Sequence, residues 1–212
     1  MKTQHIILAL LTISGLISCG GQAGSAQKGV IDSYSGSVFI DGKPAVTGIE
    51  VAAGMEIVTG EGGWCDILFP GKNIVRIYDN SQVVFTLSPD KELILKAGNI
   101  GNILSDLKEW EKGFIIETET SVVIVRGTVF FVAAESPTNV YVCCCNGSVD
   151  VKEKSSGKIN ALSAAHHQGL SVSLNASLPA GMLYHGDEDM DILAAELKKK
   201  IDWKKIGGLT DE

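Results

Sequence analysis

The sequence predicts an all-β fold, a multi-stranded β-sandwich, roll or β-helix-like domain of short strands, followed by a C-terminal amphipathic α-helix. Short apolar or alternating runs recur along most of the chain, and most of them are dense in β-branched residues. Turn signals rich in Gly, Asn and Asp separate these runs. With 212 residues, 45% of them hydrophobic and 20% charged, the chain can form one ordinary domain plus tails.

Residues 1–18 have the pattern of a secretion signal. Lys2 provides a positive start, and the apolar stretch over residues 6–17 is too short to span a bilayer comfortably. The stretch ends in LISC, which resembles the bacterial lipoprotein signal of an aliphatic residue, a small residue and a cysteine. The resemblance implies that Cys19 is lipidated and becomes the new N-terminus. The alternative is an ordinary cleaved signal with an incidental cysteine.

Residues 19–29 are rich in Gly, Ala, Ser and Gln, which is typical of a flexible tether. A lipid on Cys19 would anchor the protein to a membrane, so we expect a periplasmic or outer-membrane lipoprotein outside the cytoplasm. The net charge of −7 argues against a nucleic-acid partner, which would require a basic face. Oxidising compartments favour disulfides, and Cys65 and the cysteines at 143–145 are the candidates for pairing.

The β domain is predicted over residues 30–175. Its strand-like runs are residues 37–40, 55–58, 65–69, 74–78, 82–85, 92–96, 114–118, 121–132, 140–145, 149–151 and 170–174. Residues 100–111 break this rhythm. They fit either a helical turn that caps the sheet or a strand followed by a loop.

The C-terminal extension over residues 176–212 is predicted to contain a helix at residues 187–206. Acidic residues start this segment and three lysines follow near its end, which complements the helix macrodipole, and Gly207-Gly208 is a natural stop. We expect the helix to pack on the β domain. A membrane-surface or partner-binding helix is the alternative, suggested by Trp203 among lysines. The apolar residues that share one helical face are Met190, Leu193, Ala194, Leu197 and Ile201.

The middle of the chain, roughly residues 30–151, resembles the periplasmic FecR-type domain of bacteria. The motifs that carry the resemblance are GSVFI at 36–40, VAAGMEIVTG at 51–60, CDILF at 65–69, LILKAG at 93–98, VRGTVF at 125–130 and NVYVCCCNGSVDV at 139–151. The VRGTVF motif is the most specific of them. Within it, Gly127 indicates a bulge or a close backbone approach. Arg126 is expected to reach a carboxylate or backbone carbonyls, and Thr128 suits a strand.

The resemblance implies a surface or periplasmic β module for sensing or protein interaction, with envelope proteins or cell-wall glycans as partners. Family members that regulate transcription place a cytoplasmic segment, which engages a sigma factor, and a membrane helix before this domain. Here the domain follows a lipoprotein signal. No direct sigma-factor contact is therefore expected.

Three consecutive cysteines end an apolar strand-like run. Because alternate residues of a strand share a face, Cys143 and Cys145 are predicted to be exposed together while Cys144 faces the core. Their Cα atoms would lie about 6.6 Å apart in an extended strand. That separation is near the upper limit for a disulfide, but two thiolates so spaced can converge on one metal ion.

A hairpin loop predicted at residues 155–160 would return the chain beside the cysteine strand, which brings His166 or His167 close to the thiols. His185, just before the predicted helix, would complete a four-ligand set. Such a Cys₂His₂ or Cys₂His site favours Zn²⁺, or iron or copper under reducing conditions. Haem with a histidine or cysteine axial ligand is also compatible. A disulfide or redox pair, with Cys65 as one candidate, and plain packing are the alternatives.

The sequence contains no nucleophile elbow, phosphate loop or dinucleotide fingerprint. The acidic cluster at residues 187–191 is better explained as a helix start than as a catalytic dyad. We therefore predict a non-enzymatic, lipid-anchored FecR-type domain of the cell envelope. The alternative function is a metal- or haem-binding lipoprotein that uses the cysteine–histidine cluster.

Overall fold

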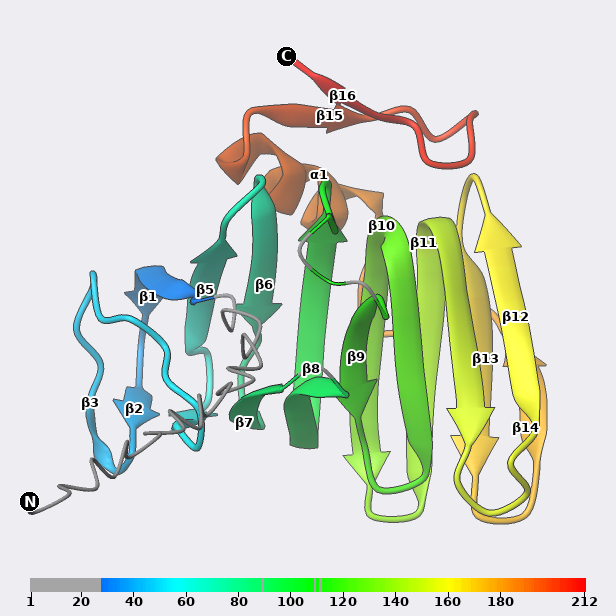
Figure 1. Ribbon diagram of the computed structural model, residues 1–212, viewed down its shortest axis with the longest axis horizontal. Coiled ribbons are helices and arrows are strands. Elements are labelled where there is room, and N and C mark those ends of the chain that lie inside the picture. Colours follow the sequence, from blue (N-terminus) through cyan, green and yellow to red (C-terminus); the bar gives the residue numbers. More distant parts are fainter. Residues whose placement is uncertain (1–27, 89, 109, 111) are drawn as a thin grey trace, which may run out of the picture.

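Figure 1 shows a computed structural model of the protein, which describes residues 28–212 except for residues 89, 109 and 111. The predicted signal peptide, Cys19 and most of the tether lie outside the described residues. Strands dominate the fold, and a single short helix lies near the C-terminus of the described chain, so the predicted all-β class with a C-terminal helix is confirmed. Within the described ranges no helix has the length and apolar character needed to cross a membrane.

Fourteen strands form one continuous sheet. In chain order they are β1 (Val30–Ser35), β2 (Val38–Ile40), β3 (Lys43–Pro44), β4 (Glu56–Thr59), β5 (Trp64–Phe69), β6 (Asn73–Ile77), β7 (Gln82–Ser88), β8 (Lys91–Leu104), β9 (Phe114–Glu117), β10 (Ser121–Ser136), β11 (Asn139–Glu153), β12 (Ile159–Ala164), β13 (Gln168–Ser173) and β14 (Ser177–Ala180). The helix α1 (Asp187–Glu196) and a hairpin of β15 (Lys199–Ile201) and β16 (Leu209–Asp211) follow.

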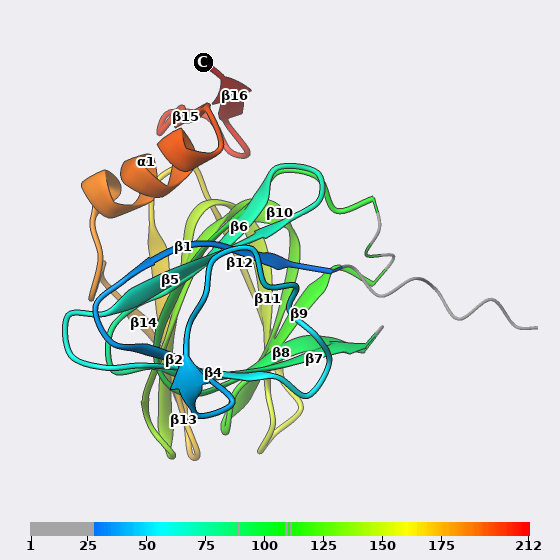
Figure 2. The ribbon, with the colours of Figure 1, turned by 90° about the vertical axis from the view of Figure 1, so that its left-hand side faces the viewer.

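The long strands β8, β10 and β11 bend and fold this sheet into two layers. The first half of β8 pairs with β7 and β9, whereas its second half pairs with β6 and β10. In the same way, β11 pairs with β13 through its first half and with β12 through its second. Seen along its long axis, the sheet closes around a central core (Figure 2). The fold is therefore a rolled two-layer sheet, one of the architectures that the sequence left open.

The chain bends at three neighbouring positions, in β10, in β11 and between β12 and β13. A residue with positive φ lies at each bend. Gly127 in β10 has φ +94°, and the register between β10 and β11 slips beside it, so the strand bulges at this residue. Gly147 in β11 has φ +131°, and His167 between β12 and β13 has φ +43°. Glycine adopts positive φ at little cost, whereas a side chain makes this conformation unfavourable. We call Gly127, Gly147 and His167 the corner row.

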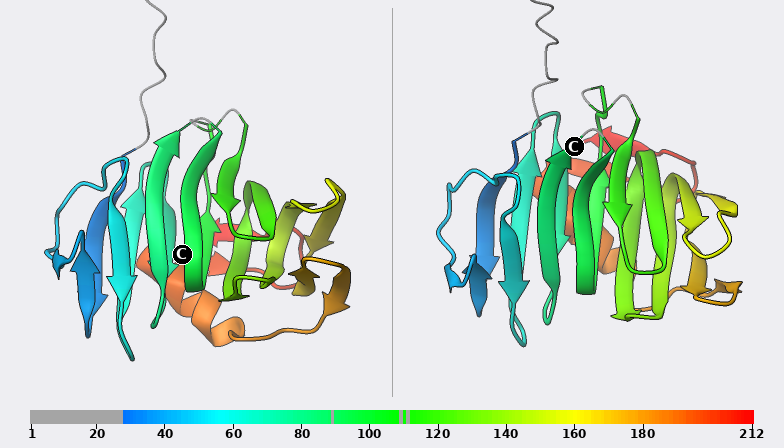
Figure 3. Two further views of the ribbon diagram at one scale, coloured as in Figure 1. Left: turned by 90° about the horizontal axis from the view of Figure 1, so that it is seen from below. Right: turned by 60° about the horizontal axis from the view of Figure 1, so that its bottom comes forward.

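The two faces of β11 belong to two different apolar clusters. Cys144 joins the core between the layers, whereas Cys143 and Cys145 join an outer cluster. The helix α1 covers this outer cluster with Met190, Leu193, Ala194 and Leu197, and Figures 1 and 3 show it lying against one side of the strands. The prediction that Cys143 and Cys145 are exposed is therefore wrong: both are 0% exposed, because His167, His185 and the outer apolar cluster surround them.

The helix is shorter than the predicted range of residues 187–206. It ends at Glu196, and Lys198 then adopts a left-handed conformation with φ +55°. Such a residue stops a helix, and the chain continues into the β15–β16 hairpin, in which Gly207-Gly208 lies in the turn. Ile201 is buried as predicted, but from a strand. Of the two alternatives for residues 100–111, the strand followed by a loop is correct.

Glu92 in β8 gives the fold a pH dependence. Its side chain is buried, with the residue 3% exposed, and accepts a hydrogen bond from the backbone N–H of Ile115. Burial raises the pKa of Glu92 from its ordinary value of 4.5 to about 7. The native state then binds more protons than the unfolded chain between these two pH values. Stability therefore falls as the pH rises through this window.

We expect the Glu92→Gln variant to lose this pH dependence, because glutamine keeps a carbonyl oxygen for the N–H of Ile115 and does not ionise. Urea unfolding at a series of pH values would show the free energy of unfolding of the wild type falling by roughly 2–3 kcal/mol relative to the variant across the window. Glu50→Gln is the control, because Glu50 is 61% exposed. Parallel pH profiles for wild type and Glu92→Gln would contradict the prediction.

Candidate metal centre

The structure brings four of the five predicted ligand residues together. The ligand atoms of Cys143, Cys145, His167 and His185 all lie within 4.8 Å of one another. The two cysteines come from β11 and His167 from the bend between β12 and β13, so the sheet supplies three of the four. His185 comes from the loop between β14 and α1. The fifth residue, His166, is not in this group, and its side chain is 52% exposed.

Two irregularities of the backbone, a β-bulge and a left-handed turn, direct the cysteine and histidine side chains toward one another. The register between β10 and β11 slips between Phe130 and Val129, which leaves Cys145 as the extra residue of a β-bulge. A bulge bends the strand and redirects side chains. The backbone N–H of His167 donates a 2.9 Å hydrogen bond to the carbonyl of Cys145. This bond holds the left-handed turn of His167 directly beside the bulge, so its ring faces the cysteines.

Hydrogen bonds define which nitrogen of each histidine faces the sulfurs. His185 Nδ1 lies 2.8 Å from the carbonyl of Leu183, which can only accept, so Nδ1 donates. Its Nε2 then presents a lone pair to Cys145 Sγ at 3.2 Å. His167 Nε2 donates to Asp187 Oδ1 at 2.8 Å, and its Nδ1 faces Cys143 Sγ at 3.5 Å. Both rings therefore have their outer nitrogen fixed and their inner nitrogen free to bind.

Residues around the cluster hold these rings in position. Asp187, the first residue of α1, also accepts from His166 Nε2 at 2.9 Å, and a carboxylate is stabilised at a helix N-terminus. Phe131 stacks on His185 with a centroid separation of 4.3 Å, and Trp203 stacks on His167 at 5.1 Å. No sequence pattern marks Asp187 or Phe131 as a site residue. Trp203 was predicted to lie in the helix, whereas it lies beyond it.

The two thiols of the cluster have opposite pKa shifts. A hydrogen bond from Cys145 lowers the pKa of Cys143 despite its burial, and the contacts with His167 and His185 act in the same direction. Burial raises the pKa of Cys145 well above its ordinary value. Burial also acts to lower the pKa of His167, but contacts with Cys143 and Asp187 outweigh it and raise this pKa. The cluster therefore favours one thiolate at neutral pH, beside histidines that stabilise its charge.

The other two cysteines of the described chain belong to the core between the layers. Cys65 and Cys144 both belong to that core cluster, whereas Cys143 and Cys145 belong to the outer cluster. Burial raises the pKa of Cys65 to about 12, which makes its thiol unreactive. Cys65, Cys143 and Cys145 are free thiols. The geometry therefore gives no support to a redox pair between Cys65 and the outer cysteines.

The arrangement matches a tetrahedral Cys₂His₂ donor set. With Zn–S near 2.3 Å and Zn–N near 2.0–2.1 Å, ligand atoms of a tetrahedral site are separated by about 3.3–3.8 Å. The sulfur–nitrogen distances of 3.5 and 3.2 Å are close to these values. Four donors within 4.8 Å leave no space for a porphyrin between them, so the cluster fits a single ion better than haem.

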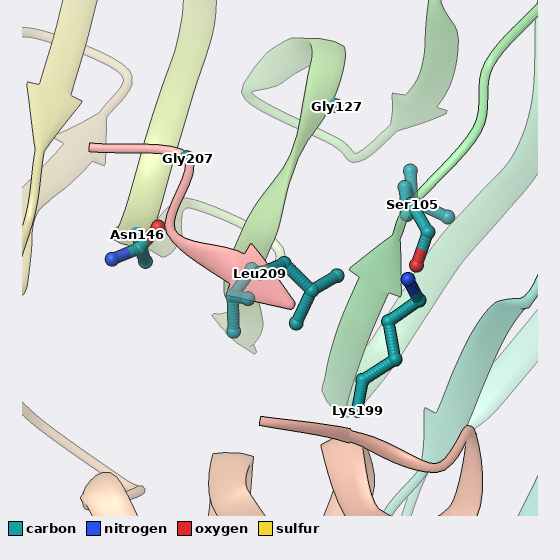
Figure 4. A pocket seen from close by; sticks show the side chains of 8 residues that line it. Ser105, Gly127, Asn146, Lys199, Gly207 and Leu209 are labelled. Carbon is teal, nitrogen blue, oxygen red and sulfur yellow. The ribbon is translucent and has the colours of Figure 1, made fainter. Parts of the chain in front are cut away.

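A cavity of about 150 Å³ lies under the C-terminal hairpin, beside Gly127 (Figure 4). The cavity is large enough to hold several water molecules. Lys199 and Ser105 point toward each other across it, and the buried Ser105 hydroxyl has no hydrogen-bond partner among the described residues. Neither a cysteine, a histidine nor a carboxylate lines the cavity.

Arg126 and Thr128 flank Gly127 in the corner row. Arg126 is exposed, and the expected contact with a carboxylate or backbone carbonyls is not among the hydrogen bonds of the described residues. The backbone of Thr128 pairs with Gly147 and with Leu104, consistent with its predicted place in a strand. The VRGT segment therefore shapes the corner of the sheet.

This fold is a rolled β module whose outer face carries a buried cysteine–histidine cluster under a short helix. The family model described as FecR protein matches residues 55–150. The resemblance to the FecR family predicted from the sequence is therefore confirmed for that segment. No curated protein matches the chain.

Two crystal structures of a "putative anti-sigma factor" from Parabacteroides distasonis ATCC 8503 are similar to this chain. One has 19% identity and a TM-score of 0.48, and the alignment covers 59% of this chain and 59% of that chain. The other has 17% identity and a TM-score of 0.49, covering 66% of this chain and 64% of that one. The chain thus spans less than two thirds of the length of either structure.

The left-handed backbone of His167 makes a testable prediction about stability. In an ordinary strand, alanine is more stable than glycine by about 0.5–1 kcal/mol. At His167 we expect the reverse order, with His167→Gly more stable than His167→Ala by about 1 kcal/mol, because only glycine relieves the strain. Both variants lose the same ring contacts. The difference between their free energies of unfolding, measured with urea on the metal-free proteins, therefore reports the backbone conformation alone.

The neighbouring pair His166→Gly and His166→Ala provides the control. His166 is not among the described residues with positive φ, so alanine should be the more stable there. The same order at both positions would contradict strain at His167.

Proposed function

We propose that the protein is a non-enzymatic FecR-type β domain of the cell envelope that serves in sensing or protein interaction. The match over residues 55–150 supports the domain type. The lipoprotein-like signal that ends at Cys19 supports an extracytoplasmic location with a lipid anchor. Contact with other envelope proteins then fits better than direct contact with a sigma factor.

The anchor can be tested in bacteria that express the full chain with a radiolabelled fatty acid. We expect label on the wild type and recovery in the membrane fraction, and we expect Cys19→Ser to lose both. Cys65→Ser is the control for loss of a cysteine, since this thiol is buried in the core. An unlabelled wild type in the soluble periplasmic fraction would instead indicate an ordinary cleaved signal.

A second function, metal binding, has a specific structural observation in its favour. Four donors converge in a buried cluster, and each histidine has its outer nitrogen held by a carbonyl or a carboxylate. Hydrogen bonds of that kind are typical around metal-bound histidines, since they fix the tautomer and the ring orientation. We propose that Cys143, Cys145, His167 and His185 bind one Zn²⁺, or iron or copper under reducing conditions.

The chemistry of the cluster suits a structural ion. Two thiolates and a divalent cation form a neutral unit, which lowers the cost of burying charge. The raised pKa of Cys145 means that uptake of the ion would release a proton from this thiol. All four positions of a tetrahedral ion would be filled by protein atoms, so no position would remain for a substrate. This supports a non-enzymatic role for the site.

The metal content of the protein, purified without oxygen and without an affinity tag, tests this function. We expect about one Zn or Fe per chain in the wild type, and tetrahedral thiolate absorption bands when Co²⁺ is added to the metal-free protein. The Cys143→Ser/Cys145→Ser double variant should lose both signals. Cys144→Ala is the matched control, because Cys144 belongs to the same triplet but faces the other cluster.

A folded wild type that binds neither Zn²⁺ nor Co²⁺ would eliminate the metal function. Equal metal loss in Cys144→Ala would show that the ligands are not the outer pair.

A further inference from the structure

The candidate centre joins two parts of the chain that meet across the outer face of the sheet. Cys143, Cys145 and His167 all belong to the sheet. His185 belongs to residues 181–212, which leave the sheet after β14 and which we call the C-terminal segment. A single ion with this ligand set would therefore bind both parts at once.

The C-terminal segment covers an apolar surface that the sheet cannot hide by itself. On the sheet side, the outer cluster consists of Ile74, Ile103, Val129, Phe131, Ala133 and Tyr141 together with Cys143 and Cys145. Four residues of α1 and its C-terminus, with Ile201, complete it. If the segment left the sheet, these side chains from β6, β8, β10 and β11 would be in contact with water.

Without an ion, the N-terminal end of the segment is held by apolar packing and by a few polar contacts. A ten-residue helix is too short to be stable alone, so α1 depends on its packing. Apart from the cluster itself, two tyrosines tie this end to the sheet. The Tyr141 hydroxyl donates to the carbonyl of Gly181 and accepts from the N–H of Leu183, and the Tyr184 hydroxyl donates to the exposed carboxylate of Glu135 in β10. The side chain of Asp187, which bonds to His167, is 44% exposed.

The other end of the segment has its own anchor. The Asn146 amide donates to the carbonyls of Asp202 and Lys205 and accepts from the N–H of Gly208. Asn146 lies in β11 beside Cys145, so the hairpin turn is tied to the sheet independently of the histidines. Release of the segment would therefore begin at His185 and α1.

We propose that the metal ion controls whether α1 stays docked on the sheet: binding through His185 locks the helix in place, and loss of the ion frees it and exposes the apolar face. This inference rests on the metal function proposed above. An ion that binds only the docked state reduces the released population in proportion to its saturation, roughly 100-fold at a free concentration 100 times its dissociation constant. The protein would thereby convert metal availability into the position of α1 and the exposure of the apolar side chains beneath it.

Hydrogen exchange of the whole protein, with saturating Zn²⁺ and with a chelator, tests the proposal. We expect amides of α1 to exchange about 100-fold more slowly with Zn²⁺ at 100 times its dissociation constant. Amides of β4 and β7, far from the cluster in the pairing order of the sheet, should not change. Metal content is measured on the same samples.

His185→Ala gives the sharper comparison, because it keeps the three sheet ligands. It should still bind Zn²⁺, more weakly, but Zn²⁺ should no longer slow exchange in α1. His166→Ala is the matched control and should behave as the wild type, since His166 is exposed and outside the four-ligand set.

The outcomes separate the two proposals. Absence of bound Zn²⁺ in the wild type would remove the metal function and this inference together. Bound Zn²⁺ with unchanged exchange in α1, or slowed exchange that persists in His185→Ala at equal metal occupancy, would overturn the docking role alone.

Discussion

The roll and the candidate centre depend on one backbone constraint: three neighbouring strands turn from one layer to the other at the same level. Such a turn requires positive φ, which glycine adopts easily and other residues adopt at a cost. Gly127 and Gly147 meet this requirement, but the third position is occupied by His167. A costly conformation persists only where its surroundings hold it, and strained residues cluster at functional sites. Here the ring of the strained residue faces two buried cysteines.

The burial of Cys143 and Cys145 helps to distinguish metal binding from simple packing on the outer face of β11. Small apolar side chains would pack under α1 as well as Cys143 and Cys145 do, and they would avoid a buried charge. Instead the lowered pKa of Cys143 favours a thiolate, and burial of an ion is costly unless it is paired. The histidine contacts offset part of that cost. A divalent cation would offset more of it, and the inner nitrogens of His167 and His185 already lie 3.5 and 3.2 Å from the two sulfurs.

The strands, the bulge at Gly127 and the alternation along β11 could be predicted from the sequence, because each rests on local periodicity or on one residue type. The end of α1 could not, since the apolar spacing continues to Ile201, which is buried from a strand. The burial of Cys143 was missed because no local pattern says what packs across a sheet face. Asp187 was overlooked because an acidic residue at a helix start already has a local explanation.

The position of the cluster relative to the family domain bears on its role. The FecR match ends at residue 150, so it contains Cys143 and Cys145 but neither His167 nor His185. The ligand set therefore arises from a FecR-type strand combined with the chain that follows it. An ion held by one strand would stabilise only that strand. An ion held across this junction changes the free energy of one part relative to the other, and such a difference between two states is what a sensor requires.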